Sequence, residues 1–591
     1  MTKKKRLIPN SNVFIALTSN QEFWDKSKEI VLLGDWCLED IDNINKYRVI
    51  PYPIKFDDIS YLNFYSYNRK LYSKYLTLCT DILNKEHQTK HSERYWDIVA
   101  GSFIFRYIGV MYEKYLTIKT LLEHYEQFDC VTIDLSRHKT IIVDELHFMQ
   151  LIQDENYNLE LYSKILSFLQ VDSKKINPKQ FQNKNSNSKF KKNIKIFSEF
   201  VFNSIFNLKT SKKIVFIKNS YLDNKSLLKL AFFSKYKIKV KFQEGYSNKF
   251  SHKYNIKARE ILQKSFIEND EFELFLKTVL PFDLPKSLIE NYSYLDKLAQ
   301  KKYPKTPPEI IFSANSWYND ELFKLWASRC IGKSKLLGMQ HGGNYGVSRF
   351  MMDEVYERKI TNYYLTWGWM ENGSNNLIPF GSTKMLNYKE SKLKSDDILF
   401  VMTTKPKYFC DLRFIPHEVI SYFEDQEVFL KNISECLLIK FRVRLYPSKN
   451  QDKYINLWKE YNKNIKIDHQ SEKFIDSLNN CKLYVTDHLM TTYLESFKMN
   501  IPTIIFLNKK YPNGLLNDIA SEEFQRLEDV GILYYSPKDA ATAINIMGDD
   551  INSWWFSPAV QKVRESFCDK FAKNPNSFIK DFDNLFDTVL R

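Results

Sequence analysis

The chain has 591 residues, of which 44% are hydrophobic and 15% aromatic, and its formal net charge is +15 at pH 7. This length exceeds what one hydrophobic core normally holds, so we expect two major domains, and the apolar content excludes a disordered chain. The eight cysteines form no CxxC pair, and the sequence contains neither a signal peptide nor an apolar run long enough to span a membrane. We therefore expect reduced thiols, no zinc site and a cytoplasmic protein.

Part of the positive charge lies in a Lys/Asn-rich insert, residues 173–195, which we interpret as a solvated loop. The remaining charge favours contact with anionic phosphates, whether on nucleotides, lipid head groups or nucleic acid. Net charge alone does not choose among these three partners.

Strand-like apolar runs alternate with helical stretches from end to end. Up to a break at 378–397, strands are predicted at 13–19, 29–36, 212–219, 236–242, 308–316, 333–343 and 362–369, and helical stretches at 61–125, 223–235 and 320–330. After the break, strands are predicted at 398–406, 437–448, 465–469, 482–488 and 502–508, and helices near 420–435, 491–499 and 556–590.

This alternation predicts parallel sheets covered by helices on both faces, hence an α/β fold. We expect two Rossmann-like, doubly wound domains facing a cleft, with helical and Lys/Asn-rich insertions in the first. The predicted boundaries are 1–385 for the first domain, 386–555 for the second, and 556–591 for a closing helix that packs back on the first. Ligands of such sheets bind beyond the carboxyl ends of the strands, so functional residues should follow the strands.

The first domain contains a glycine-rich turn after the strand at 333–343. Four of the 15 glycines of the chain fall within 338–346, around Gln340 and His341. Glycines such as Gly342 and Gly343 would let a ligand approach the backbone, and a histidine there suits a donor phosphate or a leaving group. The alternative is a loop histidine in a tight turn. Neither a P-loop nor a GxGxxG dinucleotide motif is present.

Other residues of the first domain also follow strands. Ser313, Asn315 and Ser316 are candidates for the cleft wall. Asp35 could be a base or nucleophile on the acceptor side, although a turn-capping aspartate is an alternative. The sequence has no GxSxG, no HExxH and no DxD flanked by apolar residues, so we predict no metal site.

In the second domain, three strand ends carry residues suited to an anion. Thr491 and Thr492 open a helix, whose N-terminus would offer free N–H groups to a phosphate, while Glu495 would accept hydrogen bonds from a ribose. The alternative is a T-x-x-E box in which the helix caps itself. The guanidinium of Arg444 could grip a phosphate, or simply lie at a strand edge. The predicted donor-binding residues are Gln340, Gly342, Gly343, Thr403, Thr404, Lys405, Arg444, Tyr446, Pro447, His488, Thr491, Thr492 and Glu495.

The motifs LGDWC, SANSWYND, QHGGNYG, YLTWGW, VRLYPS and TDHLMTTYLESFKMNIPTIIF together resemble a family of transferases associated with surface-carbohydrate (O-antigen) biosynthesis. The resemblance runs from about residue 13 to 510, apart from the insert. More distantly, the second domain is similar to GT-B glycosyltransferases, including the Kdo transferases of capsule and O-antigen assembly. In those enzymes an Arg/His–Pro turn and a Ser/Thr-rich turn hold a CMP-activated sugar. Here Tyr446–Pro447 replaces His–Pro, whereas Thr491, Thr492 and Glu495 match the hydroxyl turn and its acidic residue.

The resemblance implies a metal-independent GT-B glycosyltransferase, with a nucleotide-sugar as substrate and no further cofactor. A CMP-linked ulosonic acid is the preferred donor, an oligosaccharide or lipid-linked glycan the acceptor, and peripheral contact with an anionic membrane is expected. His341 and Asp35 are the candidate catalytic residues, with positioned cations and helix ends stabilising the leaving phosphate.

Three alternatives stay open. Two are enzymes, a polyol-phosphate transferase of the teichoic-acid type and a nucleotide-sugar epimerase, which share paired parallel-sheet domains. The third, a basic nucleic-acid-binding protein, is disfavoured because the lysine cluster lies in a low-complexity insert with few aromatic residues for base stacking.

Overall fold

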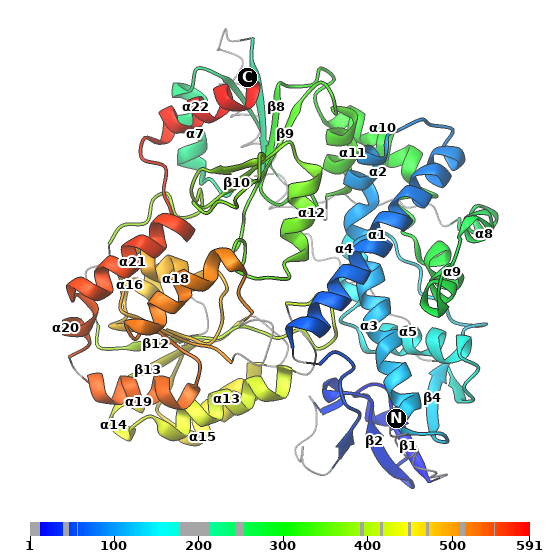
Figure 1. Cartoon of the computed structure of the whole chain (residues 1–591), viewed down its shortest axis with the longest axis horizontal. Helices are drawn as coiled ribbons and strands as arrows, with labels where there is room; N and C mark the ends of the chain where they lie inside the picture. The colour runs from blue at the N-terminus through cyan, green and yellow to red at the C-terminus, as the bar shows by residue number, and fades with distance from the viewer. Residues whose placement is uncertain are drawn as a thin grey trace.

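The fold is described from a computed structural model, which covers residues 12–38, 47–55, 57–177, 212–242, 253–318, 320–390, 395–413, 416, 418–446, 451–468, 472–508, 515–548 and 550–591. Three parallel sheets run through these residues, and helices cover them (Figure 1). The predicted α/β class with parallel sheets is confirmed.

The first sheet has five strands in the order β3-β2-β1-β4-β5. Their bounds are Arg48–Val49, Glu29–Leu32, Val13–Ala16, Asp129–Ile133 and Lys174–Ile176. A helical region separates β3 from β4, and it consists of α1 (Asp58–Glu86), α2 (Glu93–Trp96), η4 (Asp97–Gly101) and α3 (Ser102–His124). The single helical stretch predicted at 61–125 is thus two long helices with a short connection.

The second sheet has six strands in the order β11-β10-β9-β8-β6-β7. Their bounds are Leu377–Pro379, Tyr363–Thr366, Lys335–Met339, Ile310–Ser313, Ile214–Lys218 and Lys237–Lys241. The third sheet is also six-stranded, in the order β14-β13-β12-β15-β16-β17. Its strands are Lys466–Asp468, Phe441–Arg444, Ile398–Val401, Leu483–Thr486, Thr503–Phe506 and Leu533–Tyr534.

Each sheet winds outward in both directions from its first strand in the chain. The order therefore reverses between β1 and β4, between β6 and β8, and between β12 and β15. Ligands of open α/β sheets bind in the crevice beyond the carboxyl ends at such a reversal. Each of the three reversals is therefore a candidate ligand site.

The strands predicted at 13–19 and 29–36 do not join the sheet formed by 212–379. They form the first sheet instead, because the helices between β3 and β4 carry their own buried residues and build a core around it. Segment 1–385 therefore holds two sheets rather than one, while the second and third sheets share a separate hydrophobic core. The predicted boundaries at 385 and 555 stay predictions.

The remaining helices pack on these sheets. Before β8 they are η2 (Asp35–Leu38), α4 (Glu145–Leu151), α5 (Glu155–Phe168), α7 (Asn224–Phe233), α8 (Ile256–Ser265), α9 (Glu271–Asp283) and α10 (Tyr292–Lys302). After β8 they are α11 (Glu321–Arg329), α12 (Met352–Ile360), α13 (Glu418–Asn432), α14 (Glu435–Leu438), α15 (Gln451–Tyr461), α16 (Phe474–Asn479), α17 (Thr492–Lys498), α18 (Asp518–Asp529) and α19 (Pro537–Met547). Over the described parts of the chain, no helix has both the length and the apolar character needed to cross a membrane.

The closing segment is not one helix. It consists of α20 (Ile551–Trp555), α21 (Pro558–Phe571) and α22 (Phe578–Leu590). Prolines explain the breaks, because Pro558 begins α21 and Pro575 lies between α21 and α22, and proline cannot continue a helix. α22 lies on the second sheet beside α7, where Asp587 accepts a hydrogen bond from Tyr236 Oη at 2.6 Å (Figure 1).

Candidate functional site

The carboxyl ends of the second and third sheets meet where the turn after β9 touches the turn after β15. A Cβ built on Gly343 would lie 2.5 Å from the carbonyl oxygen of Met490. Tyr493 Oη donates to the carbonyl of Gly343 at 3.4 Å, and Asn344 Nδ2 lies 3.6 Å from Met490 Sδ. The QHGG turn and the Thr491–Thr492 turn, which are 150 residues apart in the chain, are therefore direct neighbours.

Gly343 serves this contact rather than the approach of a ligand. Gly343 has no room for a side chain because the third sheet's turn occupies that space, and Gly346 has φ +69° with Trp369 directly against it. Gly342 differs, since the nearest atom to a Cβ there would be a Tyr345 carbon at an ordinary 3.6 Å. Close packing of two turns therefore replaces the prediction that a ligand approaches the backbone at Gly343, whereas the prediction for Gly342 stays a prediction.

His341 is held by a buried carboxylate. Its Nε2 lies 2.9 Å from Glu357 Oε1 and 2.6 Å from Tyr345 Oη, and Tyr364 Oη donates to Glu357 Oε2 at 2.7 Å. Burial raises the pKa of Glu357, and His341 acts against this increase. With a proton on Nε2 facing Glu357, the lone pair remains on Nδ1, for which the described residues provide no hydrogen bond. The arrangement suits a general base oriented by a carboxylate.

Gln340 lies inside the protein and makes its hydrogen bonds there. Its Oε1 accepts from Trp367 N at 2.9 Å and Trp369 Nε1 at 2.8 Å, and its Nε2 donates to the carbonyl of Gly342 at 2.9 Å. The side chain is 1% exposed. Gln340 thus fixes the turns after β9 and β10, and its predicted role in donor binding is corrected to one of support.

The strand order of the third sheet reverses between β12 and β15, where a ligand crevice is expected. Thr403, Thr404 and Lys405 follow β12, and Asp487 and His488 follow β15. Lys405 lies close enough to lower the pKa of both Asp487 and His488. The two strand ends and a nearby ammonium group make this crevice suited to an anionic ligand.

Asp487, which sequence analysis missed, is the centre of a buried hydrogen-bond network. It accepts from Tyr422 Oη and from Gln426 Nε2, both at 2.9 Å, while Tyr422 Oη accepts from Thr403 N at 3.1 Å. Burial raises the pKa of Asp487 to about 7, although these hydrogen bonds and Lys405 oppose the rise. The signal was available, because Asp487 directly follows a strand at a sheet reversal.

His488 is buried beside Asp487 and stays neutral. Burial, with Lys405 second, lowers its pKa to about 3. Its Nδ1 accepts from Met490 N at 3.2 Å, Nε2 is buried, and a hydrogen bond to the backbone of Val401 acts against the fall in pKa. The Nε2–H group is a candidate donor to a ligand that binds beyond β12 and β15.

Two residues predicted to bind the donor are engaged elsewhere. Arg444 Nη1 donates to Asp468 Oδ2 at 2.8 Å and to Ser477 Oγ at 3.0 Å, so its guanidinium ties β13 to β14 and α16. Glu495 is 2% exposed and pairs with Lys384 Nζ at 2.6 Å, so it is not available to a ribose. Both predictions are corrected, because a protein partner satisfies each charge.

The T-x-x-E capping box is also wrong. α17 begins at Thr492 with Thr491 as its N-cap, and no side chain caps it. Thr492 Oγ1 instead accepts a hydrogen bond from Tyr484 Oη at 2.7 Å. Glu495 Oε2 accepts one from Tyr388 Oη at 2.8 Å. Thr491 lies against the glycine turn, with Oγ1 4.0 Å from the position of a Cβ on Gly342. Tyr446 is half-exposed after β13, and Pro447 lies outside the described residues.

Asp35 lies in η2, is 5% exposed, and η2 packs on α13. The pairing of Asp35 and His341 across one cleft stays a prediction.

A cavity of about 290 Å³ lies at the carboxyl ends of β6 and β7, and His341 is not among the residues that line it. Asn219, Tyr221 and Asn315 do line it, and Asn315 Nδ2 donates to Tyr221 Oη at 3.2 Å. Asn219 and Tyr221 have φ of +50° and +59°, an unusual conformation for residues other than glycine. The ring of Tyr221 is stacked at 6.3 Å from that of His341, so Tyr221 links the cavity to the candidate base.

The predicted residues Ser313 and Ser316 support this cavity from behind. Ser313 Oγ accepts from Ser316 N at 3.0 Å, and Ser316 Oγ accepts from Asn219 Nδ2 at 2.8 Å. Both serines are buried. Of the three residues predicted for this wall, Asn315 alone faces the cavity.

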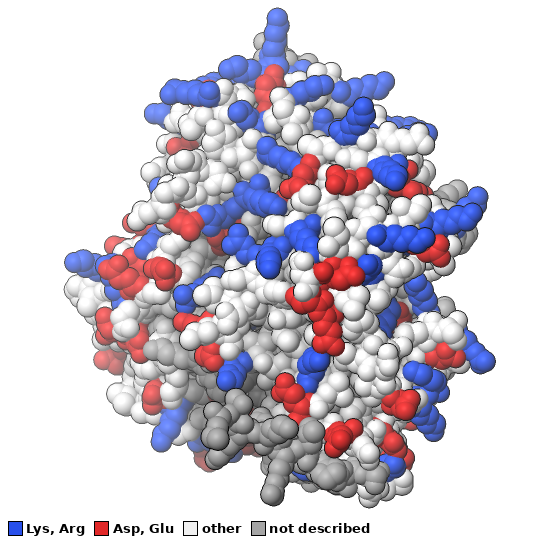
Figure 2. Space-filling model, turned by 45° about the vertical axis from the view of Figure 1, so that its right-hand side comes forward, with Lys and Arg blue, Asp and Glu red and all other residues white. Residues whose placement is uncertain are grey.

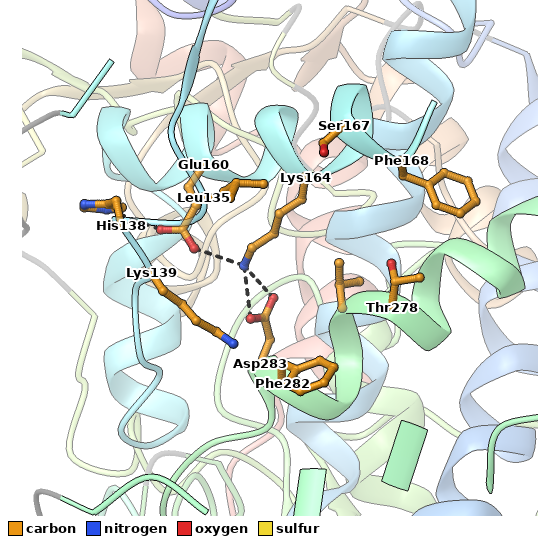
Figure 3. A pocket seen from close by; sticks show the side chains of 11 residues that line it. Leu135, His138, Lys139, Glu160, Lys164, Ser167, Phe168, Thr278, Phe282 and Asp283 are labelled. Carbon is orange, nitrogen blue, oxygen red and sulfur yellow. Dashed lines mark hydrogen bonds and ion pairs between the residues drawn. The ribbon is translucent and has the colours of Figure 1, made fainter. Parts of the chain in front are cut away.

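A further cavity, of about 320 Å³, lies beyond β4 between α5 and α9 (Figure 3). Lys164 extends between Glu160, at 3.0 Å, and Asp283, at 2.9 Å, as the dashed lines show. Although burial alone would raise the pKa of Glu160, Lys164 and hydrogen bonds lower it to about 2. The charges of this cavity largely neutralise one another within the protein.

No group of three or more His, Cys, Asp and Glu side chains in the described ranges is arranged to hold a metal ion. The model of a family described as LIC12162 family transferase matches residues 13–586. No curated protein sequence matches the chain significantly.

Solved structures with a similar fold include MurG of Acinetobacter baumannii, which is 9% identical, with 64% of this chain and 100% of that chain covered and a TM-score of 0.33. A protein described as UDP-N-acetylglucosamine 2-epimerase from Listeria monocytogenes is 12% identical, with 64% and 98% covered and a TM-score of 0.35. WaaG, a glycosyltransferase involved in lipopolysaccharide biosynthesis, is 10% identical, with 63% and 99% covered and a TM-score of 0.27. At these values the likeness does not extend to a shared substrate.

Proposed function

The chain belongs to the LIC12162 family of transferases, and we propose that it transfers a sugar from a nucleotide donor to a glycan acceptor between its second and third sheets. The observation that carries the proposal is the contact between the turns at Gly343 and Met490. Because of this contact, the turn that carries His341 after β9 lies against the turn after β15, which belongs to the proposed anion site of the third sheet. A donor and an acceptor held in the two crevices would meet there.

The donor nucleotide would occupy the crevice of the third sheet. Thr403, Thr404 and the ammonium of Lys405 would contact its phosphate, and His488 Nε2 would supply a further donor. The acceptor would lie in the cavity that Tyr221 links to His341, where amides can bind hydroxyl groups and the ring of Tyr221 can cover an apolar sugar face. Arg444 and Glu495 take no part, because their charges are paired within the protein.

The reaction then follows from the position of His341. Its Nδ1 would take the proton of the acceptor hydroxyl as the new bond from oxygen to the anomeric carbon forms. The bond from that carbon to the donor phosphate breaks, and the nucleotide leaves with the electron pair. Glu357 would stabilise the imidazolium, and Lys405 the departing negative charge. No metal ion enters these steps, so transfer should be unchanged by a chelator.

Within this proposal, the finer choices are a CMP-linked ulosonic acid as donor, a lipid-linked or oligosaccharide acceptor of surface-polysaccharide synthesis, and action in the cytoplasm. They rest on the resemblance of the TDHLMTTYLES and VRLYPS segments to those of Kdo transferases.

Thermal melting with CMP, UDP, GDP and CDP-polyols would identify the nucleotide, because a ligand that binds only the folded state raises the melting temperature. Sugar transfer should then be assayed with acceptor from a cell extract, comparing wild type with His341→Ala and with Ser328→Ala, a buried serine of α11, as a folding control. We expect His341→Ala to lower the rate by roughly 100-fold or more while nucleotide binding persists. Stabilisation by none of the nucleotides, or full activity of His341→Ala, would contradict the proposal. Conversion of a nucleotide-sugar without acceptor would favour an epimerase instead.

A further inference from the structure

The segment 212–242, which forms β6, α7 and β7, has a strongly unequal charge. It contains nine lysines, no arginine and one acidic residue, Asp223. It lies outside the Lys/Asn-rich insert at 173–195, so the insert does not account for this charge. An excess of lysines over acidic residues in a folded element is balanced either by acidic side chains of neighbouring elements or by an anionic partner.

α7 separates its side chains into two faces. Leu227, Leu230 and Ala231 are buried against the sheet. The opposite face carries Lys225, Lys229, Phe232 and Phe233, which recur at i, i+4, i+7 and i+8 and therefore line up along one side of the helix. Phe232 is 53% exposed and Phe233 73% exposed, although phenylalanine is normally among the most buried residues.

Neighbouring elements neutralise only part of this charge. Lys235 pairs with Asp587 of α22, and Asp583 accepts from Ser234 Oγ at 2.5 Å. Asp223 caps the first turn of α7 and accepts from Lys225 N at 2.9 Å. By contrast, the ammonium groups of Lys212, Lys213, Lys225 and Lys229 have no carboxylate within ion-pair distance in the described part of the chain.

We propose that this face, defined by Lys225, Lys229, Phe232 and Phe233 and called the α7 face below, docks on an anionic lipid bilayer. The two adjacent rings would enter the interface between head groups and acyl chains, while the lysines remain at the level of the phosphates. On the side of the molecule seen in Figure 2, Lys and Arg predominate over Asp and Glu at the upper end, the end at which Figure 1 shows α7.

The observations favour a bilayer over nucleic acid. The α7 face combines lysines with exposed phenylalanines at the end of a helix, a pattern that suits insertion into lipid. Segment 212–242 lacks arginine, the residue best suited to stacking on bases and to bidentate phosphate contacts. The inference goes beyond sugar transfer and does not depend on it, because membrane binding is measured without substrate.

The test is flotation of the full chain with vesicles of phosphatidylcholine alone and of phosphatidylcholine mixed with phosphatidylglycerol, at low and high salt. We expect binding only to the anionic vesicles, with loss at high salt. Each lysine near the surface contributes about 1 kcal/mol, so Lys225→Gln/Lys229→Gln should weaken binding by roughly 30-fold. Phe232→Ser/Phe233→Ser should weaken it at least about tenfold, because two apolar rings no longer enter the bilayer.

Matched controls are available on the third sheet's unit. Lys538→Gln/Lys562→Gln removes the same charge from exposed positions of α19 and α21, and Ile546→Ser removes an apolar side chain that is 81% exposed. The proposal predicts that these variants bind as the wild type does. It is overturned if the wild type ignores anionic vesicles, if the controls lose as much binding as the α7 variants, or if the α7 face binds an oligonucleotide but no vesicle.

Discussion

Replacing Gly343 by alanine should disturb the candidate site by driving its two neighbouring turns apart. The new Cβ would stand 2.5 Å from the oxygen and 2.9 Å from the carbon of the Met490 carbonyl. Backbone cannot rotate away as a long side chain can, so the two turns must separate. Reaching a contact distance of about 3.3 Å requires a movement of roughly 0.8 Å.

Overpacking of this kind costs about 1–3 kcal/mol, which should lower the melting temperature by a few degrees. The rate of sugar transfer should fall more steeply, by up to about 100-fold, because a displacement near 1 Å misaligns the reacting groups. The assay is the melting temperature together with transfer rate and nucleotide affinity. Nucleotide affinity should change little, since the third sheet's crevice keeps its own residues.

Gly342→Ala is the matched control, one residue away in the same turn. Its Cβ would meet a Tyr345 carbon at 3.6 Å and Thr491 Oγ1 at 4.0 Å, which are ordinary contacts. Melting and activity should therefore stay close to wild type. If Gly342→Ala and Gly343→Ala behave alike in both measurements, the close contact between the turns is not what shapes the site.

Three further outcomes follow from buried ionisable groups. Glu357→Gln should lower the transfer rate by roughly 100-fold or more, because His341 loses the carboxylate that orients it; an unchanged rate would contradict the pairing. The Asp487 pKa is raised from 3.8 to about 7, so the stability that it contributes is present at low pH and is lost as pH rises through about 7, by up to about 4 kcal/mol. The difference in melting temperature between Asp487→Asn and wild type should therefore shift in favour of the variant as pH rises from about 5 to about 8. A difference that stays constant over this range would refute this. Lys164→Met should destabilise the protein by about 3–5 kcal/mol, because two buried carboxylates lose their partner, whereas the surface-pair control Lys277→Met should cost less than about 1 kcal/mol.

Sequence alone could predict the parallel sheets and the neighbouring turns. Strand ends are readable from apolar runs, and doubly wound sheets place their ligand crevices at the carboxyl ends. His341 and Thr491 therefore had a physical reason to be expected near one another, and their turns do lie in contact. Asp487 could have been found by the same rule.

Sequence alone could not predict how charges pair across the chain. Arg444 is satisfied by Asp468, whose position depends on how β14 pairs with β13. Glu495 meets Lys384, which lies 111 residues earlier on the segment that joins the two sheets. The residue types indicated anion and ribose binding, but the partner of a charged group is set by tertiary packing. The separate first sheet was missed for a related reason, since strand pairing at long range leaves no local pattern.

The segment that follows β12 packs into the hydrophobic core around the first sheet, and this contact affects the candidate site. Thr403, Thr404 and Lys405 are followed by Tyr408, Phe409 and Leu412, which are buried among residues of the N-terminal unit. The next residue on, Arg413, donates to Asp353 Oδ2 at 2.8 Å, and Arg106 of α3 donates to Asp353 Oδ1 at 2.7 Å. Asp353 lies one helical turn before Glu357 on α12, the helix whose carboxylate holds His341. The ion pairs of Asp353 therefore connect three elements: the loop proposed to bind the donor, α12, and α3 beside the first sheet. The first sheet and its helices therefore hold the donor loop at a set distance from His341. Mutations that break these ion pairs should lower the rate of sugar transfer more than they lower nucleotide affinity.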